Sequence, residues 1–162
     1  MRKRDVIVII CTMVLILIGS QVFHLIRYHA LQERISSEFY EQSDQLSAAL
    51  AEIKADSAGN CHTNHAQAVA YTLGTLVEYT RKSQLTAAES SELRMFLWQL
   101  SVYLNDQITM TPSFNAILPT LTAIFTDFSH SRGNPDIAQQ LYTAMHRTEE
   151  RTAACMTVLN YA

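Results

Sequence analysis

Glycine and proline are scarce in this chain: its 162 residues include four glycines and three prolines. An all-β fold reverses direction every few residues and uses these two residue types to do so, so their scarcity argues against a sandwich or a barrel. Nearly half of the residues are hydrophobic (48%), which argues against a disordered chain. We therefore predict an all-α fold with long helices and short connections.

The sequence motifs of enzymes and cofactor proteins are missing as well. There is no glycine-rich phosphate loop, no GxSxG nucleophile elbow, no HExxH zinc motif and no CxxCH haem attachment sequence. The acidic residues stand alone or form pairs such as Glu149 and Glu150, which suits a solvated helix surface better than acid and base catalysis. We predict that the protein is not an enzyme and needs no cofactor.

One long apolar run lies near the start, in "MRKRDVIVIICTMVLILIGSQVFHLIRYH". The stretch 6–26 has no formal charge, and at ~1.5 Å per residue a helix of this length crosses the roughly 30 Å hydrocarbon core of a bilayer. We predict a transmembrane signal anchor. A cleaved signal peptide is the alternative, but the run continues past Ser20 and is longer than an ordinary signal-peptide core.

The basic residues around this run predict its orientation. Positive charge gathers on the cytoplasmic side of a span, which makes residues 1–5 a cytoplasmic tip and residues 27–162 an extracytoplasmic domain, in the bacterial periplasm. The side chains expected to anchor the two ends are Arg2, Lys3, Arg4, Arg27 and Tyr28. The exported part has nine Lys and Arg against fourteen Asp and Glu, a net charge of −5, which disfavours nucleic acid as a partner.

Hydrophobic periodicity predicts an antiparallel bundle of about five helices after the span. The first continues from the span, and the second begins at Asn60. The third begins at Thr86, which forms a capping box with Glu89. The predicted buried positions are Leu31, Ile35, Phe39, Leu46, Leu50 and Ile53 in the first helix, Ala66, Val69, Leu73, Leu76 and Val77 in the second, and Leu93, Phe96, Leu97, Leu100, Tyr103 and Leu104 in the third.

Proline marks the last two predicted helices. The fourth begins at Pro112, and Pro119 within it is expected to kink or split it. The fifth opens at Asn134 and Pro135 and is expected to run to the end of the chain. Its stripe is Ile137, Leu141, Met145 and Leu159, and the stretch "RTEER" from residue 147 to 151 is read as its solvated face.

Two further residues stand out within these helices. Gly74 lies inside the second helix, where glycine costs roughly 1 kcal/mol against alanine, so we expect a close helix contact there. Trp98 lies off the apolar stripe of the third helix. We expect it to cap the edge of the core; anchoring a partner is the alternative.

The segment "NCHTNH" places one cysteine and two histidines at the start of the second helix. In an up-and-down bundle this point and the end of the fifth helix lie at the same pole, so Cys61 and Cys155 are expected to form a disulfide in the oxidising periplasm. The alternative is a metal site that uses His62 and His65, but no further motif completes it. A haem held by His130 and His146 is possible in principle but has no sequence support.

Two classes of function remain open. The first is a non-enzymatic interaction module, in which the exported bundle binds an envelope protein or a second copy of the chain. Assembly factors, inhibitors, and immunity or exclusion proteins are of this class. The second is a periplasmic bundle that binds a ligand, a metal or haem in order to sense or transfer it. Chemoreceptor-type sensor bundles and phage inner-membrane lysis subunits are similar in architecture only, so they carry over no residues.

Overall fold

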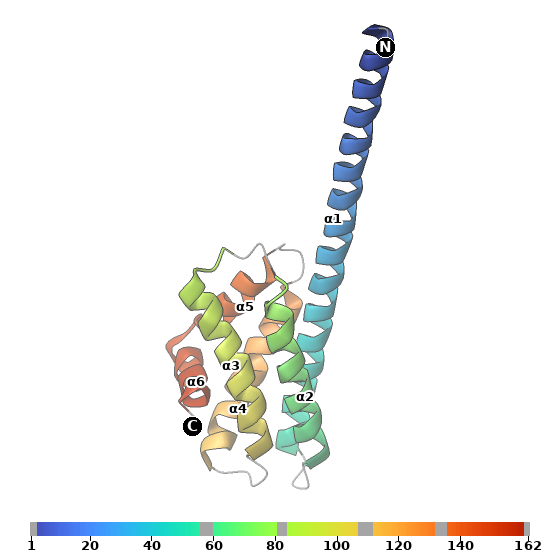
Figure 1. Ribbon diagram of the computed structural model, residues 1–162. Helices are drawn as coiled ribbons and strands as arrows, with labels where there is room; N and C mark the ends of the chain where they lie inside the picture. Colours follow the sequence, from blue (N-terminus) through green and yellow to red (C-terminus); the bar gives the residue numbers. More distant parts are fainter. Residues whose placement is uncertain (1–2, 56–59, 81–83, 107–111, 132–135, 161–162) are drawn as a thin grey trace. The chain divides into compact units, whose positions relative to one another are not determined.

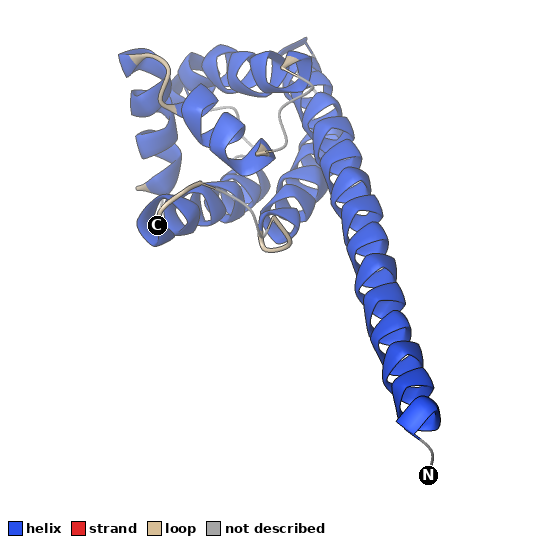
Figure 2. Ribbon diagram, turned by 90° about the horizontal axis from the view of Figure 1, so that it is seen from above, coloured by secondary structure: helices blue, strands red, loops and turns tan. Residues whose placement is uncertain are grey.

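The computed structural model describes residues 3–55, 60–80, 84–106, 112–131 and 136–160 (Figure 1). Within these ranges every regular element is an α-helix and no strand occurs (Figure 2), which confirms the all-α prediction. The helices are α1 (Lys3–Ala55), α2 (Asn60–Val77), α3 (Ala87–Asp106), α4 (Pro112–His130), α5 (Ile137–Met145) and α6 (Glu149–Leu159). Packing divides the chain into an N-terminal segment, Met1–Arg34, and a helical domain, Ile35–Ala162.

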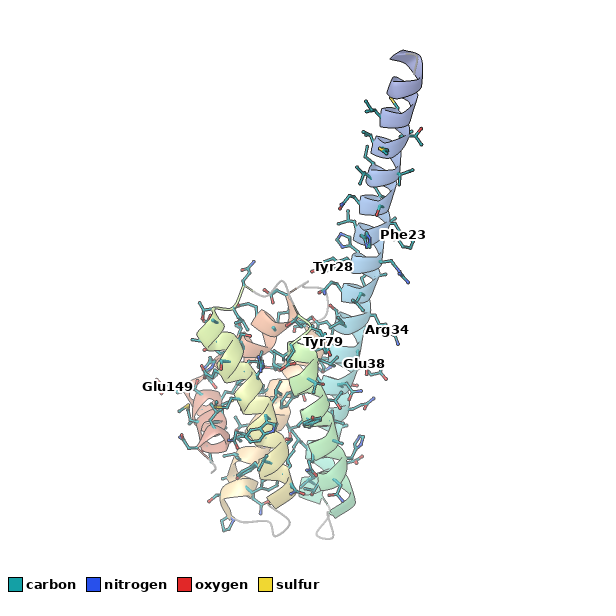
Figure 3. The ribbon with its side chains drawn as sticks, viewed as in Figure 1. Phe23, Tyr28, Arg34, Glu38, Tyr79 and Glu149 are labelled. Atoms are coloured by element: carbon teal, nitrogen blue, oxygen red, sulfur yellow. The ribbon has the colours of Figure 1, made fainter. Side chains whose placement is uncertain are left out.

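The N-terminal segment exposes its apolar side chains. Of the described helices, α1 alone is long and apolar enough to cross a membrane; its most apolar window has a mean hydropathy of 1.8, and none of that window is buried. Side chains such as Phe23 project outward from the ribbon (Figure 3). The helix is continuous through Ala55, as predicted. The predicted buried stripe is wrong at Leu31, which is exposed because the packed core begins at Ile35.

The second part of α1 packs against α4 in the helical domain. Phe39 meets Phe128 edge-on, with ring centroids 5.5 Å apart, and both rings are buried. Ser47 and Thr126 share a hydrogen bond of 2.6 Å across the same pair of helices. The contact therefore combines apolar burial with a satisfied polar pair, as buried hydroxyl groups require.

Aromatic rings also join α3 to α4. Phe96 stacks on Phe125 with centroids 6.5 Å apart, and Tyr103 lies 5.6 Å from Phe114. All four side chains are buried, and the pairing runs in opposite directions along the two helices. Every predicted core position of α3 is buried, so the helical periodicity of this segment was read correctly.

α2 and α3 form an antiparallel pair, side by side in Figure 1. A β-carbon placed on Gly74 lies 3.6 Å from the Leu97 β-carbon, so the helices approach closely there, as predicted. The predicted capping box at the start of α3 is confirmed. Thr86 donates its backbone N–H to the Glu89 carboxylate (2.7 Å), and Glu89 donates its own N–H to the Thr86 hydroxyl (3.3 Å).

α4 begins at Pro112, as predicted, but Pro119 does not split it. The ring of Pro119 lies on the exposed side of the helix, between the buried residues Leu118 and Thr120. A proline in this position removes one backbone hydrogen bond on the solvent side, where water satisfies the freed carbonyl. The helix therefore continues through the proline.

The predicted fifth helix is wrong as a single element, because the chain breaks between α5 and α6. His146 closes α5 by donating its backbone N–H to the Tyr142 carbonyl (3.2 Å). Thr148 is then the N-cap of α6, and its hydroxyl accepts the N–H of Arg151 (3.2 Å). Glu149 follows in the first turn, where acidic side chains favour a helix start (Figure 3). The stretch read as a solvated helical face is therefore a turn and a helix cap.

Asp127 of α4 holds this turn in place. Its carboxylate lies 2.6 Å from the Arg151 guanidinium and 3.2 Å from that of Arg147. The hydrogen bond from Arg151 lowers the pKa of Asp127, and both arginine charges act in the same direction. One carboxylate thus ties the turn and the start of α6 to α4.

The α2–α3 connection meets the start of α5. Asp136 caps α5 by accepting the N–H of Gln139 (3.1 Å), and it also accepts the backbone N–H of Gln84. Asp136 therefore ties the residues before α3 to the start of α5. The predicted opening at Asn134 and Pro135 lies outside the described residues.

Candidate functional site

The "NCHTNH" motif lies at the start of α2, whose first residue is Asn60, the residue expected as its N-cap. The side chains of Cys61 and His62 lie outside the described residues, and His65 is exposed on the helix. The disulfide and the metal alternative therefore both stay predictions at this end.

Cys155, the other predicted half of the disulfide, is buried in α6 and is a free thiol in the structure. Burial, with a smaller contribution from the carboxylate of Glu92, raises the pKa of this thiol to about 12. A thiol with such a pKa keeps its proton at neutral pH and is a poor nucleophile. In its free form Cys155 is therefore a packing residue of the core.

A polar cluster near Cys155 joins α3 to α5 and to the turn that follows α5. Tyr142 donates its hydroxyl to Glu92 (3.0 Å), and burial raises the pKa of Tyr142 to about 12, with Glu92 adding to the effect. His146 Nε2 lies 3.3 Å from the same carboxylate. Nε2 is buried and has no hydrogen-bond partner, so this contact is an ion pair only when the imidazole is protonated. The cluster ties α3 to the end of α5, and His146 also lines a hollow of about 500 Å³ beside the start of α6.

The histidines proposed as haem ligands are placed differently. His130 is exposed at the end of α4. The sequence suggested that His146 lies in the middle of a helix, but it lies in the turn after α5. Across the described ranges, no group of three or more His, Cys, Asp or Glu side chains is arranged to hold a metal ion.

The residues predicted to anchor the membrane span are only partly described. The guanidinium of Arg27 lies over the Phe23 ring, 5.3 Å from its centroid, and Tyr28 meets His29 edge-on at 6.2 Å. Such amphipathic side chains suit the border between hydrocarbon and water. The side chains of the predicted N-terminal anchor residues Arg2, Lys3 and Arg4 lie outside the described residues.

A groove between α2 and α3 is the best candidate for a functional surface. We call it the α2–α3 groove; its volume is about 490 Å³. Its lining residues are Tyr71, Gly74, Thr75 and Glu78 from α2 and Ser91, Arg94, Met95 and Trp98 from α3. On each helix these positions recur every three or four residues, so they form one continuous face.

Three large apolar side chains stand at this groove without being covered. Tyr71 is 57% exposed, and Met95 and Trp98 are each 53% exposed. Trp98, which we expected at the edge of the core, is about half exposed and lines this groove. Exposed aromatic and methionine side chains that gather in one place mark binding surfaces more often than isolated ones do.

The groove combines a low floor with a charged rim. Gly74 has no side chain, and Thr75 and Ser91 are short, so the surface between the large side chains is hollow. At the rim, Arg94 pairs with Glu78 at 3.1 Å, and both side chains are about half exposed. An apolar centre with a polar border is the anatomy of a protein interface.

Sequence reasoning noticed Gly74 and Trp98 separately and missed the groove that contains both. The signal was available in the spacing of Ser91, Met95 and Trp98, a second helical stripe beside the buried one. The sequence placed this second stripe outside the core, but it does not show which residues of α2 lie beside it. Only the packing of α2 against α3 brings Tyr71 and Gly74 to the same groove.

Over the residues that the structure describes, the protein is an all-α bundle with a single helix long and apolar enough to cross a membrane, and it has a groove between α2 and α3. No family model matches the chain, and comparison with curated proteins and with solved structures finds no similar protein.

Proposed function

We propose that this protein is a single-pass inner-membrane protein of bacteria whose periplasmic helical domain is a non-enzymatic interaction module. The α2–α3 groove is its docking surface. In this role it serves as an assembly, inhibitory, immunity or exclusion factor of an envelope complex. The observation that carries the proposal is the exposure of Tyr71, Met95 and Trp98 around a hollow floor.

The chemistry of these side chains supports protein binding. Tryptophan, tyrosine and arginine are the residues most enriched among those that dominate interface energies, and the groove presents all three. Truncation of such a residue to alanine commonly costs about 2 kcal/mol or more of binding free energy. The groove has no cluster of titratable groups suited to catalysis.

The membrane topology is part of the same proposal. The basic residues before the span favour a cytoplasmic N-terminus, and the helical domain then lies in the periplasm. A reporter enzyme fused after Ala162 is expected to be active only outside the cytoplasm. Activity of that fusion inside the cytoplasm would reject this topology.

Photo-crosslinking in the native membrane tests the docking surface. A photoreactive amino acid placed at Met95 is expected to capture a protein, because this side chain stands at the groove. The matched control is Met156, which is also exposed but lies on α6. Equal capture from both positions, or none from Met95, would reject the groove as the docking surface. A stoichiometric metal or haem in the purified protein would favour the ligand-binding alternative.

A further inference from the structure

We propose that the α2–α3 groove binds a second copy of this chain, so that two helical domains pair through their α2–α3 faces. The inference rests on the proposed function and names the partner at the same site. Three properties of this surface support it: its shape, the placement of its rim charges and its net charge.

The surface carries both a projection and a hollow. Trp98 is exposed on α3, and Gly74 of α2 lies beside the Trp98 backbone and lines the floor of the groove. A two-fold interface brings the same patch together from both copies, so that patch must contain each shape and its complement. A two-fold axis parallel to the helices places α2 of one copy over α3 of the other. It thereby sets Trp98 of each copy over Gly74 of the second copy.

The same axis makes the rim charges complementary. Glu78 and Arg94 lie at one height on neighbouring helices, since they pair within the chain. When α2 of one copy lies over α3 of the other, each Glu78 faces Arg94 of the second copy. Two further attractive contacts then form around the apolar centre. Charges arranged in this way select the partner and the register more than they add affinity.

The charges at the groove are balanced, whereas residues 27–162 as a whole are negatively charged. Residues 27–162 carry a net charge of −5, so most pairings of two copies bring like charges together. The groove rim has one acid and one base, and its centre is uncharged. Tethering in one membrane would further raise the effective concentration of copies toward each other.

Charge reversal in the full-length protein in lipid nanodiscs or mild detergent tests this pairing. The wild-type chain is expected to have the mass of two copies. Glu78→Arg or Arg94→Glu alone places like charges in both symmetric contacts and weakens pairing by about tenfold or more. A mixture of the two variants is expected to pair again, because each contact then joins opposite charges.

Rescue by mixing distinguishes contacts between two copies from a structural role of the Glu78–Arg94 ion pair within one copy. Each variant has lost its own internal Glu78–Arg94 contact, and mixing does not restore that contact. The matched control is Glu41→Arg, an exposed acid on α1, which is expected to pair like the wild type. A wild-type chain that stays single, or variants that the mixture does not rescue, would overturn the inference. If the photoreactive group at Met95 captures a different protein, the proposed function stands and the second copy is rejected as its partner.

Discussion

The two parts of α1 have similar leucines in opposite surroundings. Leu15 in the N-terminal segment is 68% exposed, whereas Leu46 in the helical domain is fully buried. The helix has one backbone geometry throughout, so the difference comes from what packs against it. The N-terminal segment has its apolar surface all around the helix, which suits surrounding lipid. In the helical domain the apolar surface is one stripe that other helices cover.

The same comparison shows why exposed apolar side chains at the α2–α3 groove are informative. From Ile10 onward the N-terminal segment leaves its large aliphatic side chains exposed, so one more exposed leucine there carries no information. The described part of the helical domain leaves five large apolar residues exposed, and three of them, Tyr71, Met95 and Trp98, gather at one groove. Tyr79 and Met156 are the other two. The three at the groove identify a surface that the domain itself does not cover.

The largest expected effect comes from placing charge in the N-terminal segment. Leu15→Arg and Leu17→Arg together are expected to cost about 5–7 kcal/mol of insertion free energy, because each arginine near the centre of a span costs about 2.5–3.5 kcal/mol. Carbonate extraction of membranes should then release the variant. Isoleucine at both positions is the control and should stay in the pellet. Retention of the arginine variant would contradict the assignment of this segment as a membrane span.

Removal of a phenylalanine ring is expected to have different effects on stability in the two parts of the chain. Phe125→Ala is expected to lower the free energy of unfolding of the helical domain by about 3–5 kcal/mol, since this ring is buried and stacks on Phe96. Phe23→Ala, in the exposed segment, should leave that quantity unchanged. Urea unfolding of the full-length protein in detergent, followed by tryptophan fluorescence, measures both. Equal losses would show that the two segments share one core.

The cysteines extend the comparison to thiol chemistry. We expect mass spectrometry of unreduced, alkylated protein to find Cys61 and Cys155 joined and Cys11 modified. Loss of that bridge through Cys155→Ser should cost roughly 2–5 kcal/mol of stability, and replacement of His62 and His65 together should cost far less. Separate Cys61 and Cys155 peptides would disprove the bridge. Loss of a bound ion in the histidine variant would indicate the metal site instead.

A smaller effect is expected at the turn before α6. Thr148→Ala removes the N-cap hydroxyl and should destabilise the helical domain by about 1 kcal/mol. Thr157→Ala is the matched control, because that hydroxyl bonds only a carbonyl within its own helix and is exposed. Thermal unfolding monitored by circular dichroism compares the two. Similar midpoints would mean that α6 does not depend on its cap.

The smallest effect depends on pH. The arginines beside Asp127 lower its folded-state pKa, so its stabilising effect is present above about pH 4 and is lost as the pH falls through that lowered value. Asp127→Asn should cost less than about 1 kcal/mol at neutral pH, because water screens this partly exposed pair, and nothing at strongly acidic pH. Asp44→Asn, at an exposed site on α1, is the control. A loss that persists in acid would point to packing instead of charge.

Local signals in the sequence predicted the fold well. The Thr86 capping box, the start of α4 at Pro112 and the core stripe of α3 all follow from short-range rules that tertiary packing did not override. The break before Thr148 was missed because residues 146–152, which include no apolar side chain, also suit the solvated face of one long helix. The sequence around this break is therefore compatible with one long helix or with two short ones.

The candidate site was much less predictable than the fold. Trp98 was noticed, but its surroundings depend on which stripe of α3 meets α2, and that choice is made by contacts between distant parts of the chain. Cys155 was assigned to the end of one long helix. The break places it instead on α6, a separate helix that packs against α3 and α4.

The shortness of α5 and α6 has a consequence for how the domain forms. They have 9 and 11 residues, and isolated helices below about 12–15 residues are marginal in water because nucleation is costly. Neither is expected to persist until α3 and α4 provide a surface to dock on. The C-terminal part of the domain should therefore form late in folding. Its amides should exchange with solvent through local opening, at a lower free energy than those of α3.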